Sequence, residues 1–218
     1  MNDPLLVRRY SPCDRPFIRT ICCDTADLGG PVENFFSDRE VFSDMLMNYY
    51  TDYAPRFLWV AVLSGEVIGY LCGCPDTEHY LKTVSRRILP PALVKAVFRG
   101  VFLRRSTWHL LKVALISAKM GGLKRQMPYR EFPAHLHINV KGSHRGKNAG
   151  SLLMESFLKQ LKEEGIKGVH LSVREDNFSG RKFFERHGFR ELQRYPMAMP
   201  TAHSYIPGYS LIYVKSLI

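Results

Sequence analysis

The stretch from Arg145 to Gly150 holds the clearest chemical signal in this sequence. Two bases and two glycines lie in six residues, between a run typical of a buried strand and a run typical of an amphipathic helix. A glycine-rich turn between a strand and a helix leaves backbone N–H groups free at the helix N-terminus, where the helix dipole adds positive charge. Such a turn suits a phosphate or a pyrophosphate.

The glycine spacing excludes two of the three common phosphate-binding turns. A P-loop needs one residue more between Gly142 and Gly146, and it needs a serine or threonine hydroxyl where Asn148 stands. A dinucleotide fingerprint, G-x-G-x-x-G, cannot be formed from Gly142, Gly146 and Gly150. The remaining alternatives are a third kind of turn and a plain connection between strand and helix.

Two motifs indicate the third kind of phosphate-binding turn. "INVKGSHRGKNAGSLLM" (138–154) resembles the acetyl-CoA-binding signature of the GNAT N-acetyltransferase superfamily, and "NFSGRKFFERHGF" (177–189) is similar to the helix that follows it in that family. Their spacing and the elements upstream fit the family over most of the chain outside 77–130. More narrowly, "PAHLHIN" and "GYLCGCPDT" are similar to bacterial acetyltransferases that resemble the acetyltransferase-like domain of some O-GlcNAc hydrolases.

This resemblance implies acetyl-CoA as the acyl-donor substrate. The turn would wrap the pyrophosphate, and the backbone of the preceding strand would bind the pantetheine arm where two central strands splay. Asn148 stands where the family often has glycine, but asparagine tolerates left-handed backbone. Asn177 matches a family position near the pantetheine, although capping of the following helix explains it equally well. The implied binding residues are Ile138, Asn139, Val140, Arg145, Gly146, Lys147, Asn148, Ala149, Gly150 and Asn177.

Acetyl transfer to an amine needs a base, because amines are protonated near neutral pH. His135 and His137 lie two residues apart on a predicted strand, so they share a face with Asn139. A histidine suits the task of base, and we prefer His137 because it lies nearer the splay. The alternative is that both rings are hydrogen-bonded parts of a polar sheet face. Asn139 replaces the aspartate of similar sequences, and an amide cannot act as a base.

The acid that protonates the leaving thiolate is harder to identify. The family helix often carries a tyrosine after its phenylalanine, but this chain has Phe183 and Phe184 there. Tyr205 or Tyr209, expected in a loop between the last two strands, could replace it; both could equally be ordinary surface tyrosines.

Several elements must position these residues. We expect strands at 5–10, 134–140, 168–173, 191–199 and 209–217, and a hairpin around Ser64 and Gly65. We expect helices within 13–27 and 38–53, and at 148–164 and 177–189. This order predicts an α/β fold, a GNAT-like mixed central β-sheet flanked by helices, in one domain spanning 1–218.

The segment 77–130 is expected to be a helical insertion before the signature strand. It holds twelve Lys or Arg residues and one acid, Glu78, and so accounts for the whole net charge of +11. Three interpretations stay open: a positive lid that favours an acidic acceptor, a contact with a membrane surface or nucleic acid, and a solvated helical face with its apolar stripes packed inward.

The composition of the chain indicates the cellular compartment in which we expect the protein. Five cysteines are an odd number without framework or zinc spacing, so we expect buried, reduced thiols, no metal site and a reducing compartment. We recognise neither a signal peptide nor a run of about 18 apolar residues that would span a membrane. These features predict a cytoplasmic protein.

The predicted function is therefore acetyl-CoA-dependent N-acetyltransferase activity on a primary amine, by direct attack in a ternary complex. The acceptor's identity and the oligomeric state do not follow from the sequence. The alternative is a catalytically inactive acyl-CoA-binding module whose basic insertion binds an anionic partner.

Overall fold

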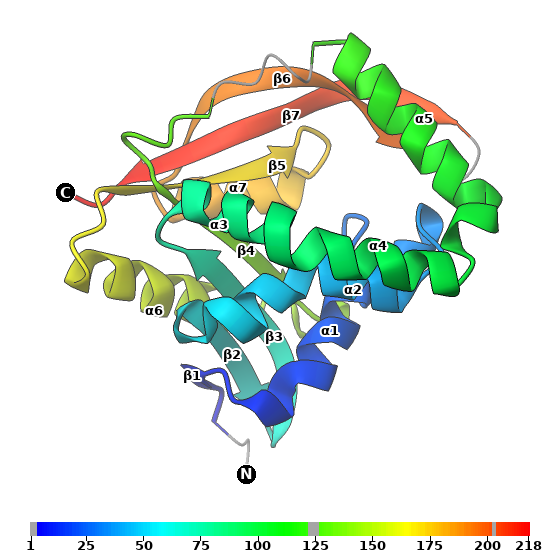
Figure 1. The fold of residues 1–218 in the computed structure, drawn as a ribbon. Helices are drawn as coiled ribbons and strands as arrows, with labels where there is room; N and C mark the ends of the chain where they lie inside the picture. The colour runs from blue at the N-terminus through cyan, green and yellow to red at the C-terminus, as the bar shows by residue number, and fades with distance from the viewer. Residues whose placement is uncertain (1–3, 122–126, 202–203) are drawn as a thin grey trace.

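The protein folds around a seven-stranded mixed β-sheet (Figure 1), described here from a computed structural model over residues 4–121, 127–201 and 204–218. The strand order is β1-β2-β3-β4-β5-β7-β6, and only β4 and β5 are parallel. The predicted fold class is confirmed. The strands are β1 (Leu6–Arg9), β2 (Leu58–Leu63), β3 (Glu66–Cys74), β4 (Ala134–Val140), β5 (Gly168–Arg174), β6 (Arg190–Pro200) and β7 (Tyr205–Ser216).

The hairpin between β2 and β3 is built on a two-residue turn. Ser64 and Gly65 both have positive φ angles, 50° and 79°. This turn geometry matches the right-handed twist of the two strands that it joins. The predicted hairpin is therefore confirmed at the predicted residues.

Helices cover both faces of the sheet. Against one face pack α1 (Arg15–Asp24) and α2 (Arg39–Asn48), the latter continued by a π-helical turn (Tyr49–Tyr53). Against the other packs α6 (Ala149–Glu163), whose Phe157 ring fills the space where a side chain at Gly73 would lie. The last helix, α7 (Phe178–Arg186), lies beside α6 through a contact of Phe183 with Gly150.

The insertion is helical as far as the structure describes it. It runs through α3 (Thr77–Thr83), a π-helical turn (Val84–Ile88), α4 (Leu89–Phe98), a short 3₁₀ turn (Val101–Leu103) and α5 (Arg105–Lys119). Figure 1 shows α4 alongside α2 and α5 across the β6–β7 hairpin. Lys124 and Arg125, two of the twelve bases, lie outside the described residues.

The last hairpin is longer than the sequence predicted. Tyr205 and Tyr209 were expected in a loop, but both lie in β7, where they pair with Pro200 and Pro196 of β6. The loop prediction was wrong because Pro207 and Gly208 mask the strand, although both residues are accommodated in a two-stranded ribbon at the sheet edge.

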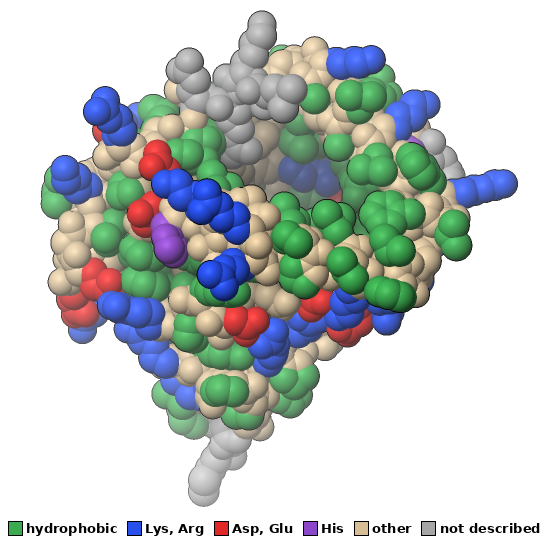
Figure 2. Space-filling view, in the orientation of Figure 1, with side chains coloured by type: hydrophobic (Ala, Val, Ile, Leu, Met, Phe, Trp, Pro, Cys, Tyr) green, Lys and Arg blue, Asp and Glu red, His purple; other side chains and the backbone are tan. Residues whose placement is uncertain are grey.

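The cysteines and the surface complete the description. All five cysteines are free, and four are buried; Cys13 is exposed, which corrects the expectation of five buried thiols. No helix in the described ranges is long and apolar enough to cross a membrane. Figure 2 shows a hollow in the molecule between α4, α5 and the C-terminal hairpin.

Candidate active site

The two central strands separate soon after they meet. β4 and β5 pair only at Ala134 with Val169 and at His135 with His170. From His137 onward the strands diverge, so Ile138–Val140 form no ladder with β5. The predicted splay is therefore present, and it leaves the backbone groups on this edge of β4 open to an added extended chain.

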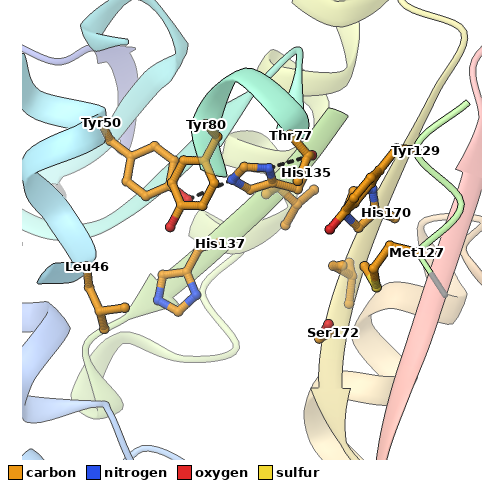
Figure 3. A pocket seen from close by; sticks show the side chains of 12 residues that line it. Leu46, Tyr50, Thr77, Tyr80, Met127, Tyr129, His135, His137, His170 and Ser172 are labelled. Atoms are coloured by element: carbon orange, nitrogen blue, oxygen red, sulfur yellow. Dashed lines mark hydrogen bonds between the residues drawn. The ribbon is translucent and has the colours of Figure 1, made fainter. Parts of the chain in front are cut away.

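A cavity of about 470 Å³ opens at the base of this splay (Figure 3). Its wall combines the α2 end and the start of α3 with β4 and β5. Half of the lining residues are aromatic: Tyr50, Tyr80, Tyr129, His135, His137 and His170. Among the described residues that line it, no Lys, Arg, Asp or Glu occurs. The cavity thus offers rings, hydroxyls and imidazoles, but no fixed charge.

His135 is held at both ring nitrogens. Thr77 Oγ1 donates its single proton to the carbonyl of Pro133 at 2.7 Å, so it must accept from His135 Nδ1 at 2.8 Å. Nε2 then accepts the hydroxyl proton of Tyr50 at 2.8 Å. This arrangement fixes the tautomer and leaves no lone pair of the ring for a substrate.

His137 has one engaged nitrogen. Asn139 Nδ2 lies 3.0 Å from His137 Nε2 and 2.9 Å from the hydroxyl of Tyr70. An amide turned end for end would accept from both partners instead, so Asn139 can support either tautomer of the ring. His137 Nδ1 makes no hydrogen bond to the described chain, and the ring is reached by solvent in the cavity that it lines.

Both histidines are neutral at neutral pH. Burial lowers the pKa of His135 to about 3, with a smaller contribution from the neighbouring His170 and His137. The protein atoms packed around the ring also lower the pKa of His137, to about 4, although its side chain stays exposed to solvent in the cavity. Burial also raises the pKa of the Tyr50 phenol well above the ordinary value, and it raises the pKa of the Tyr80 phenol. The cavity therefore disfavours charge of either sign on its own side chains.

The predicted phosphate turn lies at the far end of β4. Gly146 and Asn148 adopt left-handed backbone, with φ angles of 78° and 65°, and α6 begins at Ala149. The expectation that Asn148 accommodates this backbone is confirmed. Arg145 to Asn148 are exposed, and they precede a helix of 15 residues. The N-terminus of α6 thus faces solvent beside the splay.

Two arginines connect the splayed strands to the loop between α1 and α2. The guanidinium of Arg145 packs directly over Gly29, whose φ angle is 96°. Arg174, the last residue of β5, pairs with Asp27 at 3.0 Å and with Asp176 at 2.7 Å. One short loop therefore touches the ends of both strands that would flank a bound cofactor.

Two predicted residues on and before α7 have structural partners. Asn177 caps this helix, since its Oδ1 accepts from the backbone N–H of Gly180 at 3.0 Å. Phe184 is buried against Phe189, and Phe183 lies over His187. Both positions on this helix therefore hold phenyl rings, which carry no proton to donate.

The structure separates the tyrosines expected to act as acid from the two histidines. Tyr205 and Tyr209 are each 40% exposed on β7, and neither lines the cavity. Sequence reasoning instead missed Tyr50, Tyr80 and Thr77, which surround His135 (Figure 3). The Tyr49-Tyr50 doublet after α2 was the available signal, but aromatic residues at a helix end more often indicate core packing.

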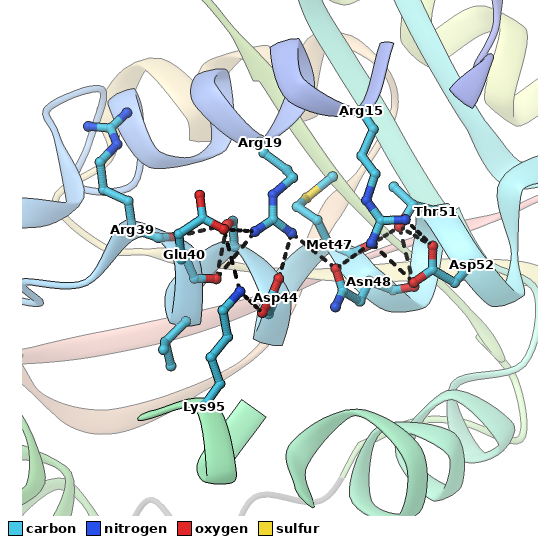
Figure 4. Close-up of polar contacts among 12 residues, drawn as sticks. Arg15, Arg19, Arg39, Glu40, Asp44, Met47, Asn48, Thr51, Asp52 and Lys95 are labelled. Carbon is cyan, nitrogen blue, oxygen red and sulfur yellow. Dashed lines mark hydrogen bonds and ion pairs between the residues drawn. The ribbon is translucent and has the colours of Figure 1, made fainter. Parts of the chain in front are cut away.

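A second hollow lies between α1, α2 and α4 (Figure 4). Several of its charged side chains form ion pairs with one another. Asp44 pairs with Arg19 at 2.7 Å and with Lys95 at 2.6 Å, and Glu40 also pairs with Arg19. Lys95 belongs to the insertion, so this network attaches α4 to α2. We regard it as a structural network rather than a binding site.

The part of the chain that the structure describes holds no group of three His, Cys, Asp or Glu residues placed to bind a metal ion.

Comparison with known proteins is consistent with this geometry. Residues 113–189 match the family model of the Acetyltransferase (GNAT) family, a range that includes the turn, the splay and α7. The crystal structure of SsHAT superposes with a TM-score of 0.73 at 26% identity, over 98% of each chain.

Two further solved structures share the fold at lower identity. A GCN5-related N-acetyltransferase from Kribbella flavida has a TM-score of 0.60 at 17% identity, over 97% of each chain. The protein yncA from Salmonella typhimurium, solved with its cofactor acetyl-CoA, has a TM-score of 0.60 at 14% identity, over 98% of this chain and 94% of that one. The narrower resemblance to the domain of O-GlcNAc hydrolases stays a prediction.

Proposed function

We propose, on the premise that this chain is an acetyltransferase of the GNAT family, that it moves the acetyl group of acetyl-CoA to a primary amine by direct attack in a ternary complex. One observation carries the proposal. The strand edge freed by the splay runs from His137, which lines an uncharged cavity, to the glycine turn at the N-terminus of α6. A thioester at one end and a pyrophosphate at the other would fit that order.

The donor would bind along β4. The pyrophosphate would accept backbone N–H groups between Arg145 and Gly150, where the helix dipole and the side chains of Arg145 and Lys147 favour an anion. The pantetheine arm would lie against Ile138, Asn139 and Val140 as an added strand. One N–H group of this edge would donate to the carbonyl oxygen of the thioester and stabilise its developing charge.

His137 would move the proton of the amine. With Asn139 turned to accept from Nε2–H, the lone pair lies at Nδ1, on the nitrogen that makes no hydrogen bond to the described chain. A pKa of about 4 makes this ring a weak base toward an amine in water. The same uncharged cavity lowers the pKa of an ammonium that enters it, since burial disfavours that charge as well.

The imidazolium of His137 would then serve as the acid. As the amine nitrogen forms its bond to the acetyl carbon, the C–S bond breaks and the pair of electrons leaves on sulfur. An imidazolium with a pKa of about 4 gives its proton readily to a thiolate, whose conjugate thiol has an ordinary pKa of roughly 8.5. One residue would thus account for both proton transfers. No tyrosine would be needed on α7, where this chain has Phe183 and Phe184.

The cavity lining favours an uncharged acceptor body. The sequence suggested an acidic acceptor on account of the basic insertion, but three insertion bases pair with acids of the α2 region. Lys95 binds Asp44, while Arg99 and Arg104 bind Asp38. We infer a primary amine on an apolar or aromatic group, which the tyrosine rings would contact.

The first test is calorimetry with acetyl-CoA, with CoA and ATP as controls. We expect acetyl-CoA and CoA to bind with micromolar affinity and ATP to bind poorly. The double variant Arg145→Glu, Gly146→Trp should lose most of this affinity because it reverses a charge and fills the turn. Unchanged affinity in that variant would contradict the proposal that this turn binds the pyrophosphate.

The second test is turnover. Release of the CoA thiol should depend on an amine, with arylalkylamines preferred over amines that carry a carboxylate. Preference for the acidic amines would contradict the acceptor class. Tight binding of acetyl-CoA without turnover on any amine would instead support the alternative of a non-catalytic acyl-CoA-binding module.

A further inference from the structure

The insertion exposes an unusual amount of apolar surface where α4 turns into α5. Phe98 and Leu103 are 86% and 89% exposed, and Trp108 is 62% exposed. Figure 2 shows hydrophobic side chains gathered over these two helices, next to the hollow. We name this surface the apolar corner and define it by Val97, Phe98, Leu103, Trp108, Leu111 and Leu115.

Both helices place their smaller residues inward and their larger apolar residues outward. On α4, Ala92 and Ala96 are buried, whereas Leu93 and Val97, one position further along, are exposed. On α5, the inward positions include Thr107 and Val113, and Trp108, Leu111 and Leu115 form an outer stripe at helical spacing. Of the three interpretations left open by the sequence, the one in which the apolar stripes pack inward does not hold for these larger side chains. An exposed apolar face of this size indicates a contact surface.

The charge around the apolar corner is of one sign. From Leu89 to Lys119 the chain contains six Lys or Arg residues and no acid. Lys95, Arg99 and Arg104 form ion pairs with acids of the α2 region. The other three bases lie on the outer side of the insertion, where no acid in the part of the chain that the structure describes neutralises them. These are Arg105, Lys112 and Lys119, which are exposed and form no ion pair within the described residues. Arg86 and Arg87 are also exposed, just before α4.

We propose that the apolar corner docks on the surface of a lipid bilayer that contains anionic lipids. Its apolar side chains would enter the interface between headgroups and acyl chains, and the bases beside them would contact lipid phosphates and carboxylates. This inference goes beyond acetyl transfer, because it concerns the surface at which the enzyme works rather than the reaction.

The contacts of Trp108 support this occupant. Its indole N–H donates to the carbonyl of Phe102 at 2.7 Å, so the polar atom of the side chain is satisfied inside the protein while the ring stays exposed. Tryptophan with its ring at the headgroup level is typical of membrane interfaces. A second copy of the chain is disfavoured as the occupant, since two such corners would bring like charges together.

Flotation with lipid vesicles tests the proposal. Vesicles of phosphatidylcholine with about one-third phosphatidylserine should carry the protein at low salt, whereas vesicles of phosphatidylcholine alone should carry much less. The double variant Phe98→Ser, Leu103→Ser should bind the anionic vesicles at least about tenfold more weakly, because its two most exposed apolar groups are lost. Arg105→Glu combined with Lys112→Glu should show a similar loss.

Matched controls separate this effect from general changes in charge or hydrophobicity. Phe17→Ser removes an apolar residue that is 51% exposed on α1, and Lys159→Glu reverses an exposed charge on α6. Neither should alter vesicle binding. Calorimetric binding of acetyl-CoA should be the same in all variants, so a failure of the membrane proposal is distinct from a failure of the proposed reaction.

A spectroscopic readout reports on the docking site itself. The chain has two tryptophans, Trp59 and Trp108, so Trp59→Phe leaves Trp108 as the reporter. Its fluorescence should shift to the blue with anionic vesicles. Vesicle binding that persists unchanged in Phe98→Ser, Leu103→Ser, or an emission unaffected by vesicles, would overturn the proposal. A dimer that this variant dissolves, without any vesicle binding, would assign the corner to a second copy.

Discussion

The hydrogen bonds of His137 and His135 differ, and the proposed functions of the two rings rest on that difference. His135 has a partner on each ring nitrogen, Tyr50 and Thr77, whereas His137 keeps Nδ1 for the cavity. A ring with both nitrogens engaged positions the cavity wall. A ring with one nitrogen accessible to substrate can exchange a proton with it. This contrast agrees with the preference for His137 that its place on the strand suggested, and it adds a reason that the sequence could not supply.

Replacement of His137 tests the assignment of the base. His137→Ala should lower kcat about 100-fold, the scale of general acid–base catalysis, and leave the affinity for acetyl-CoA unchanged. Steady-state kinetics and calorimetry measure the two quantities. His135→Ala is the comparison, and we expect it to reduce stability more than chemistry. Full activity of His137→Ala would contradict the proposal that His137 is the base and would indicate a structural function for the ring.

The partner of His137 offers a second prediction. Asn139→Asp places a carboxylate about where the amide lies, 3.0 Å from Nε2, and an anion there favours the charged ring. The pKa of His137 should rise from about 4 by at least about one unit. An NMR titration of the ring proton measures it, and the control is Asn48→Asp, at a residue that faces Arg15 and Arg19 and does not line the cavity. The same pKa in both variants would show that the two side chains do not touch in solution.

Acid should destabilise the fold through His135. Its folded pKa of about 3 lies below the ordinary value of 6.5, so between these values the unfolded chain holds a proton that the folded chain excludes. Stability is full above pH 6.5 and falls as the pH drops through this window, by up to about 1.4 kcal/mol per unit. Urea unfolding between pH 6.5 and 5 measures the slope. His135→Gln should reduce the slope and leave the part that His137 contributes through its own lowered pKa, and an equal slope would contradict the burial of a neutral His135 ring.

The sequence predicted the histidine pair and the phosphate turn because both are local patterns. It did not predict their partners. Thr77 and Tyr50 lie 58 and 85 residues from His135 along the chain, and only the packing of α2 and α3 against β4 brings them together. Nor did the sequence predict that Tyr205 and Tyr209 lie on β7 outside the cavity lining, since nothing local shows where that strand carries them.

At the scale of elements, the loop between α1 and α2 limits the position of Arg145. Gly29 adopts a left-handed backbone directly beneath the guanidinium. Gly29→Val should both strain this loop and displace Arg145, since the new side chain would occupy the place of the guanidinium. We expect the affinity for CoA to fall by about tenfold, the equivalent of about 1.4 kcal/mol.

Calorimetry on Gly29→Val measures that affinity. The control is Gly65→Val, at a turn with a positive φ angle but with open space around the new side chain. It should show strain in unfolding experiments without a change in CoA binding. Equal CoA affinity in both variants would show that Arg145 does not depend on this loop.

Element boundaries were predicted well where the hydrophobic period was clean. β4 runs over Ala134–Val140 as expected, and α6 differs from its predicted range by one residue at each end. The β6–β7 hairpin was underestimated, because Pro207 and Gly208 oppose a strand by local preference and a neighbouring strand overrides them.

At the scale of the whole molecule, buried Asp38 ties the insertion to the rest of the protein. Its carboxylate caps α2 by accepting a hydrogen bond from the N–H of Val41, and it forms an ion pair with Arg99 at 2.9 Å. Burial by itself would raise the pKa of Asp38, but the Val41 N–H and the Arg99 guanidinium outweigh it and lower the pKa. Removing this carboxylate takes away a helix cap and an ion pair at once.

Asp38→Ala should lower the free energy of unfolding by roughly 2 kcal/mol. Urea denaturation measures this change, and Asp24→Ala, at a half-exposed ion pair with Arg39, should cost no more than about 1 kcal/mol. Limited proteolysis should also cut first within α4 or α5 in Asp38→Ala. Equal stability of the two variants would show that Asp38 does not hold the insertion.

The sequence located the insertion by its charge but could not orient it. The residues of α4 offer two apolar faces, one with Ala92 and Ala96 and one with Leu93 and Val97, and periodicity alone does not say which meets the core. The larger face is the outer one, because the gap between α4 and α2 accommodates only alanine-sized side chains at these positions.

Thr77 gives this architecture a mechanical meaning. It is the first residue of α3, so the whole insertion is rooted in it, and its hydroxyl fixes the tautomer of His135 in the cavity wall. Tyr80 lies one turn further along the same helix and also lines the cavity, so a tilt of α3 would move two side chains of the cavity wall together. The start of the insertion and one wall of the cavity are therefore the same residue, so a load on the insertion would be felt at His135.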